Sequence, residues 1–172
     1  MRPFGDCRDK AGAALLRGWW AKYRLHLLRF AVALMALAGL LRLWNEFWRL
    51  LFEPGRLGAI DLRILHRLVH AWFAGRPVYS ELKSAIHPPA TYVILWPLLG
   101  WLEVTPARWL WAATTVGMIA CLVYLMVRES GAETRLERVF MALLPLSMYA
   151  TGATIGNGQL IVHLLPMLVN PR

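Results

Sequence analysis

The sequence predicts an all-α integral membrane protein, a multispan helical bundle, and two observations carry that prediction. Hydrophobic residues make up 58% of the chain and the mean hydropathy is +0.46, whereas about 45–50% of an ordinary soluble domain is apolar. The segment from Trp109 to Val127 contains no charged residue. At about 1.5 Å per residue, a helix of this length crosses a hydrocarbon core about 30 Å thick.

Four full spans and a partial fifth are expected within a membrane domain of residues 25–172. Aromatic residues flank the first span, as interfacial belts do, and Arg29 and Arg42 near its ends can extend to the headgroups. Pro97 and Pro145 interrupt two later spans, which is tolerated inside a bundle. The expected spans are residues 25–43, 85–102, 109–127, 139–155 and, as the partial fifth, 160–169.

The charge pattern predicts the orientation. Residues 1–24 form a basic tail with six Lys and Arg residues against two Asp residues. The positive-inside rule therefore places the N-terminus in the cytoplasm of an inner (plasma) membrane and the loop of residues 44–84 outside. Strict alternation then places residues 128–138 outside and Gly158 inside, although the side of Gly158 stays open because the last segment can be re-entrant.

The net charge of +9 is spread over span ends and loops. This distribution favours contact with membrane lipids, through anionic headgroups or a phosphorylated lipid, over binding to nucleic acid. We therefore expect lipid partners and no nucleic-acid partner.

The outer loop is expected to contain an amphipathic helix over residues 62–73, which is typical of a helix lying flat in the headgroup region. One face carries Leu62, Leu65, Val69 and Trp72, and the other carries Arg63, His66, Arg67 and His70. The two histidines have the spacing of metal ligands on a helix. No acidic third ligand stands at a motif distance and the arginines repel a cation, so we expect no metal site. No motif predicts a cofactor.

Asp61 stands just before this helix, where a carboxylate can cap the first free amides. Two interpretations are open: a helix cap paired with Arg56 or Arg63, or a carboxylate that takes part in chemistry at the membrane surface. Farther along, Gly75-Arg76-Pro77 predicts a helix stop and a turn, and Pro88-Pro89 predicts a rigid entry into the next span.

A set of short motifs resembles glycosyltransferase family 87. The motifs are Asp-Leu-Arg-Ile-Leu from Asp61, Ala-Gly-Arg-Pro-Val-Tyr ending at Tyr79, His-Pro-Pro from His87, then Pro97, and Gly-Gln ending at Gln159. Their order and spacing are similar to those of this family of multispan GT-C enzymes, whose known members include polyprenyl-phosphate-dependent mannosyltransferases. The resemblance covers the chain from about Gly58 onward.

The resemblance implies roles for particular residues. Asp61 matches the first-loop aspartate that acts as catalytic base, and Gln159 matches the glutamine of the Gly-Gln motif. Tyr79 and the prolines after His87 match positions that shape the loop and the mouth of the cavity. His87 stands where the family commonly has tyrosine, and Leu65 where an aromatic residue is frequent. Family members are longer, so the resemblance implies an N-terminal part that needs the missing C-terminal spans.

A lipid-linked donor would require positively charged residues in the loop. Its departing phosphate favours cations, and the candidates are Arg63, Arg67, Arg76 and Lys83, each of which has lipid-headgroup contact as its alternative role. Tyr79, His87 and Gln159 are the other candidate substrate-binding residues. The chain has no Gly-rich phosphate loop and no Asp-x-Asp pair, which favours a lipid-linked over a nucleotide-linked donor.

Two functions of different classes remain, an enzyme and a non-catalytic membrane protein. The first is a membrane glycosyltransferase that moves a hexosyl, expected to be mannosyl, group from a polyprenyl-phosphate donor to a lipid or glycan acceptor at the outer face. The alternative is a non-catalytic small integral membrane protein or an inactive truncated relic of such an enzyme, in which Asp61 and the arginines only fix helix positions.

Overall fold

The computed structural model describes residues 6–54, 57–81 and 86–169, and within them the chain is helical without a strand. The all-α class is therefore confirmed. The helices are α1 (Asp6–Phe52), α2 (Ile60–Phe73), α3 (Val78–Glu81), α4 (Pro89–Leu99), α5 (Val104–Glu129), α6 (Arg135–Ser147), α7 (Tyr149–Asn157) and α8 (Ile161–Val169).

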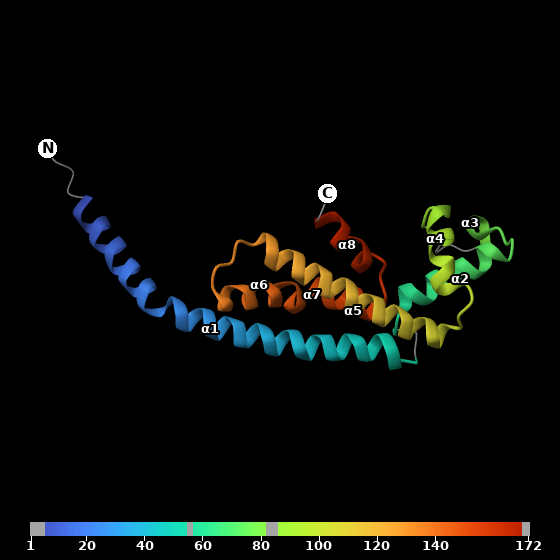
Figure 1. The fold of residues 1–172 in the computed structure, drawn as a ribbon, viewed down its shortest axis with the longest axis horizontal. Helices are drawn as coiled ribbons and strands as arrows, with labels where there is room; N and C mark the ends of the chain where they lie inside the picture. The colour runs from blue at the N-terminus through green and yellow to red at the C-terminus, as the bar shows by residue number, and fades with distance from the viewer. Residues whose placement is uncertain (1–5, 55–56, 82–85, 170–172) are drawn as a thin grey trace.

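Three rods lie side by side along the length of the molecule (Figure 1). They are α1, α5 and the bent pair α6–α7, and α8 packs against α5. Helices α2, α3 and α4 gather at the end where α1 stops and α5 starts (Figure 1). We call these three short helices the cap.

Two helices in the described residues are long and apolar enough to cross a membrane, Lys22–Phe52 of α1 and Val104–Glu129 of α5. The second contains the span expected at 109–127, and the first contains the span expected at 25–43. Helices α6 and α7 meet at a bend of 51° and together make a third candidate. The segment expected to span at 85–102 contains only the 11-residue α4, so the count of four full spans is not confirmed.

The short α4 also changes which connecting segments lie at the same end of the molecule. Because α4 belongs to the cap, α5 runs away from the cap, and the link of residues 130–134 between α5 and α6 lies at the opposite end of the molecule (Figure 1). The turn at Gly158 lies against the cap instead, where a Cβ would touch Leu62 of α2. This arrangement differs from the strict alternation predicted from the sequence, which placed 128–138 on the side of the loop 44–84 and left the side of Gly158 open.

Helix α1 is longer than expected at both ends. It is continuous from Asp6 to Phe52, through the predicted tail boundary and into the residues expected to start the outer loop. No proline occurs in this stretch until Pro54, which disfavours helical conformation in the residue before it. The helix therefore ends just before the first proline that follows it.

The amphipathic helix expected at 62–73 is present as α2, starting at Ile60. Its apolar residues Leu62, Leu65, Leu68 and Val69 are buried among side chains of α1, α4, α5 and α7. The expectation that this face lies in lipid is wrong, because the face is part of the protein core. The predicted turns hold: Gly75 has φ of 70° just after α2, and Pro89 begins α4.

Candidate functional site

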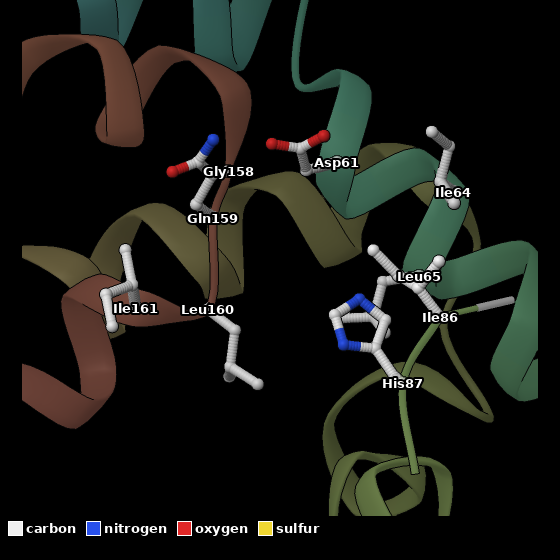
Figure 2. A pocket seen from close by; sticks show the side chains of 9 residues that line it. All are labelled: Asp61, Ile64, Leu65, Ile86, His87, Gly158, Gln159, Leu160 and Ile161. Carbon is white, nitrogen blue, oxygen red and sulfur yellow. The ribbon is translucent and has the colours of Figure 1, made fainter. Parts of the chain in front are cut away.

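A pocket of about 470 Å³ opens between the cap and the link that joins α7 to α8 (Figure 2). Three predicted site residues line it: Asp61 from α2, His87 from the segment before α4, and Gln159 from the link. The remaining lining residues are mainly apolar, namely Ile64, Leu65, Ile86, Gly158, Leu160 and Ile161. The fold thus brings together polar groups that lie far apart in the sequence.

Asp61 does not cap α2. The N-cap residue is Ala59, which has φ of 49° and makes no side-chain cap hydrogen bond, and Asp61 lies in the first helical turn. A carboxylate in this turn is still stabilised by the positive end of the helix dipole. The side chain is half-buried, faces the pocket, and makes no hydrogen bond or ion pair within the part of the chain that the structure describes. Arg56, one of its predicted partners, lies outside that part.

Gln159 is positioned by a turn that ends α7. Gly158 adopts φ of 71°, its N–H donates to the carbonyl of Ile155 at 2.9 Å, and the N–H of Gln159 donates to the carbonyl of Thr154 at 2.9 Å. This pair of bonds is the Schellman motif, which favours glycine at the left-handed position. The side chain of Gln159 then points into the pocket toward Asp61 (Figure 2).

The same turn packs closely on the first turn of α2. A Cβ at Gly158 would lie 2.7 Å from the Cβ of Leu62, and the N–H of Ala59 donates to the carbonyl of Gly156 at 3.1 Å. Glycine is therefore required at 158 both for its backbone conformation and for the close approach. This is the structural role of the Gly-Gln motif in this chain.

Tyr79 positions His87 and does not line the pocket. Its hydroxyl donates a hydrogen bond to the backbone carbonyl of His87 at 2.6 Å, while its ring contacts the rings of Trp72 and Tyr92. Tyr79 can therefore shape the loop through its hydrogen bond to the His87 carbonyl. The His87 side chain itself lies at the pocket, across from Gln159 (Figure 2).

The predicted cations lie elsewhere. Arg63 and Arg67 line a second pocket of about 370 Å³ with Ile60 and Ile64, and Ile64 borders both pockets. Arg76 is exposed in the turn after α2. Lys83 lies outside the described residues. Among the lining residues of the Asp61 pocket there is accordingly no Lys or Arg.

His66 and His70 hold α2 against α4. The Nε2 atom of His66 hydrogen-bonds the backbone carbonyl of Leu102 at 2.8 Å, in the link between α4 and α5. That of His70 hydrogen-bonds the carbonyl of Leu99 at 3.1 Å, a group that the end of α4 leaves without an internal partner. Burial lowers the pKa of His66, and the bond to Leu102 opposes that shift. No group of three or more potential ligands for a metal occurs in the described residues.

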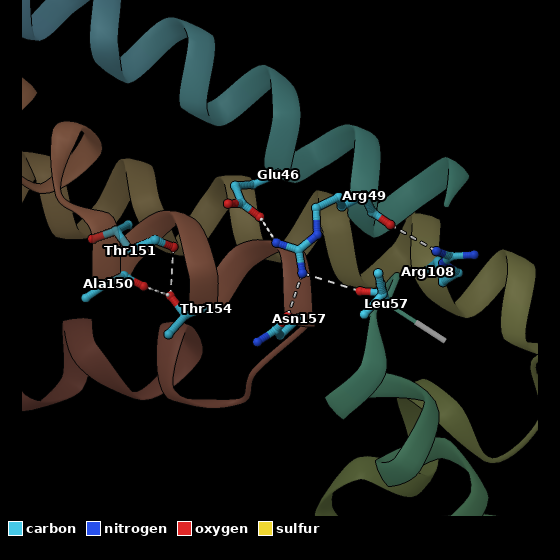
Figure 3. Close-up of polar contacts among 8 residues, drawn as sticks. All are labelled: Glu46, Arg49, Leu57, Arg108, Ala150, Thr151, Thr154 and Asn157. Carbon is cyan, nitrogen blue, oxygen red and sulfur yellow. Dashed lines mark hydrogen bonds and ion pairs between the residues drawn. The ribbon is translucent and has the colours of Figure 1, made fainter. Parts of the chain in front are cut away.

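Sequence reasoning missed Arg49. Its guanidinium donates to the carboxylate of Glu46 at 2.7 Å, to the side-chain oxygen of Asn157 at 2.9 Å and to the carbonyl of Leu57 at 3.3 Å (Figure 3). Arg108 of α5 in turn donates to the carbonyl of Arg49 at 3.1 Å (Figure 3). The available signal was a Glu and an Arg three residues apart in a mainly apolar stretch, which was expected to belong to the outer loop.

No protein-family model, curated protein or solved structure matches the chain. The resemblance to glycosyltransferase family 87 therefore rests on the motifs alone and stays a prediction.

Proposed function

We propose that this chain is part of a GT-C-type membrane glycosyltransferase that transfers a hexosyl, preferably mannosyl, group from a polyprenyl-phosphate donor to a lipid or glycan acceptor. One observation supports it most: Asp61 and Gln159, which match separate motifs of the family, line one pocket with His87, which stands where the family commonly has tyrosine. A chain that needed these residues only to fix helix positions has no reason to gather them around a cavity.

Asp61 acts as the base in this reaction. The acceptor hydroxyl gives its proton to the carboxylate as its oxygen bonds to the anomeric carbon, and the bond from that carbon to the donor phosphate breaks. The phosphate leaves with the electron pair, and one displacement inverts the anomeric centre. A carboxylate that is half-buried and makes no hydrogen bond or ion pair in the described residues is available to accept a proton.

The neighbouring groups take the remaining parts. The Gln159 amide can both donate to and accept from sugar hydroxyls, and His87 faces it across the pocket. Arg63 and Arg67 bind the donor phosphate from the adjoining pocket, which shares Ile64 with the Asp61 pocket. Arg76, exposed in the turn after α2, adds positive charge.

The cap end lies at the outer face of the inner membrane in this proposal, with the N-terminus in the cytoplasm. The basic residues at the start of the chain support this orientation through the positive-inside rule. By analogy with the family, further spans complete the wall of the cavity beside the apolar residues of the pocket.

The test uses membranes from cells that carry the intact gene and from cells in which it is disrupted. Both are incubated with polyprenyl-phosphate mannose labelled in the sugar, and label is followed into the lipid and glycan fractions. Label transferred only by the intact membranes supports the proposal. Equal profiles in the two membranes, with the protein detected in the first, overturn it in favour of a non-catalytic membrane protein.

A further inference from the structure

We infer that Arg49 and Asn157 are positioning residues that hold Asp61 and Gln159 at a fixed separation across the pocket. The inference rests on the proposed function for its catalytic consequence and on the structure alone for its geometry. Neither residue lines the pocket. Both act through the chain segments that carry the pocket residues, and we call Glu46, Arg49, Leu57 and Asn157 the Arg49 clamp.

The clamp joins three parts of the chain at one guanidinium. Arg49 belongs to α1, Leu57 to the connection that leads into α2, and Asn157 to the end of α7. Arg49 donates to acceptors in each of the other two parts, to Asn157 at 2.9 Å and to Leu57 at 3.3 Å (Figure 3). A planar guanidinium can serve several acceptors at once in fixed directions, whereas a Lys ammonium is a point charge on a flexible stem.

Glu46 balances the charge of the clamp. Its side chain is buried, with 8% of the residue exposed, and it accepts from Arg49 at 2.7 Å. Gly156 is pressed against this pair, because a Cβ at that position would overlap the Glu46 carboxylate. Arg49 stays partly exposed, so the ion pair is only part-buried, and the buried carboxylate still needs good geometry and further hydrogen bonds around the pair to offset its desolvation. The Asn157 and Leu57 oxygens provide those bonds to Arg49.

Two residues of the clamp lie shortly before the pocket residues in the chain. Asn157 precedes the Gly158 turn that aims Gln159 into the pocket, and Leu57 precedes the first turn of α2 that carries Asp61. The two segments also touch directly through the bond from Ala59 to Gly156. Loosening the clamp therefore lets the base and the amide move apart without removing either.

The first arm of the test measures geometry without activity. Hydrogen exchange of residues 57–62 and 156–161 is compared in the wild-type protein and in Asn157→Leu, which removes the acceptor, and Asn157→Asp, which keeps one. We expect exchange in both segments to rise about 10-fold or more in Asn157→Leu and to stay near wild type in Asn157→Asp. Asn157→Ala is measured alongside, in case the leucine variant does not fold.

The control is Arg42→Met. Arg42 also joins α1 to α7, but at the other end of α7, where its guanidinium lies over the ring of Tyr149 at 4.6 Å. If the clamp only contributed to packing of α1 on α7, Arg42→Met would raise exchange at 57–62 and 156–161 as much as Asn157→Leu does. That result, or wild-type exchange in both acceptor-free variants, overturns the inference.

The second arm measures transfer of labelled mannose. We expect Asn157→Leu to lower kcat about 100-fold with KM nearly unchanged, because misplacing reacting groups by about 1 Å has an effect of this size. Asn157→Asp should restore kcat. Wild-type kcat in Asn157→Leu contradicts the positioning role, whereas a wild-type protein without any transfer contradicts the proposed function and leaves the exchange arm to decide the geometry.

Discussion

The hydroxyl of Tyr79 donates a hydrogen bond to the backbone carbonyl of His87 at 2.6 Å. This bond fastens α3 to the segment that enters α4, and so it fixes the place of His87 at the edge of the pocket. Tyr79, at the end of the Ala-Gly-Arg-Pro-Val-Tyr motif, thus acts on the pocket through the backbone of His87.

Tyr79→Phe should therefore loosen His87 while the ring stays in place. A hydrogen bond of this kind contributes about 0.5–1.5 kcal/mol to stability, so we expect a small loss of thermal stability and faster hydrogen exchange over residues 86–91. Tyr149→Phe, which changes an exposed tyrosine on α7, is the control. Unchanged exchange over residues 86–91 in the Tyr79 variant would show that the bond does not hold this segment.

Gly158→Ala should destabilise the protein more than Gly75→Ala. Both glycines have a φ near 70°, but a Cβ would meet Leu62 only at 158, since nothing lies within 4 Å at 75. Backbone strain should cost about 1–2 kcal/mol at each site, and overpacking should add about 1–3 kcal/mol at 158 alone. Melting in detergent measures the difference. Equal losses in the two variants would mean that the turn does not press on α2.

The stability of the cap should fall in mild acid because of His66. Burial lowers the pKa of its imidazole below the ordinary value of 6.5, so the folded protein binds this proton less readily than the unfolded chain does. Stability is then full above about pH 6.5 and is lost as the pH falls from there toward the lowered pKa. Melting temperatures between pH 7.5 and 5.5 should decline less in His66→Gln, whose amide can still donate to Leu102.

The matched control for that experiment is His26→Gln, on an exposed part of α1. It should keep the acid sensitivity of the wild-type protein. If the His66 and His26 variants show the same decline, His66 is not the residue responsible.

Labelling of single cysteines tests the orientation. Ser80 is exposed in the cap and Ser130 is exposed in the link between α5 and α6, at the other end of the molecule (Figure 1). With Cys7 and Cys121 replaced by serine, an impermeant maleimide should label Ser80→Cys in intact cells and Ser130→Cys only after lysis. The opposite pattern would reverse the proposed topology, and labelling of both in intact cells would restore the alternation predicted from the sequence.

The sequence predicted those parts of the fold that depend on local chemistry. The uncharged stretch from Trp109 to Val127 is within α5, and the amphipathic run after Asp61 is α2. Gly75 and Pro89 mark the turns where glycine and proline favour them. Each of these features follows from residue periodicity or from backbone preference within a few positions.

The arrangement of these parts was not predictable in the same way. An apolar helix face looks the same in the sequence whether lipid or protein covers it, so the burial of Leu62 and Leu65 came only from the fold. The apolar segment around Tyr92 was long enough to suggest a span, but α4 is short and lies in the cap. That one difference moved the Gly158 turn to the side of Asp61. Arg49 was missed for another reason, because residues 44–52 were expected in the outer loop and instead belong to α1.

Transfer by Asp61→Asn tests the central claim most directly. The amide has the same shape as the carboxylate and cannot accept a proton as a base, and Glu133→Gln, which changes an exposed residue in the link between α5 and α6, is the matched control. With labelled polyprenyl-phosphate mannose and equal amounts of protein in the membrane, we predict that Asp61→Asn loses about 100-fold to 10,000-fold in rate and that Glu133→Gln keeps the wild-type rate. Transfer by Asp61→Asn at the wild-type rate would contradict the assignment of Asp61 as the base.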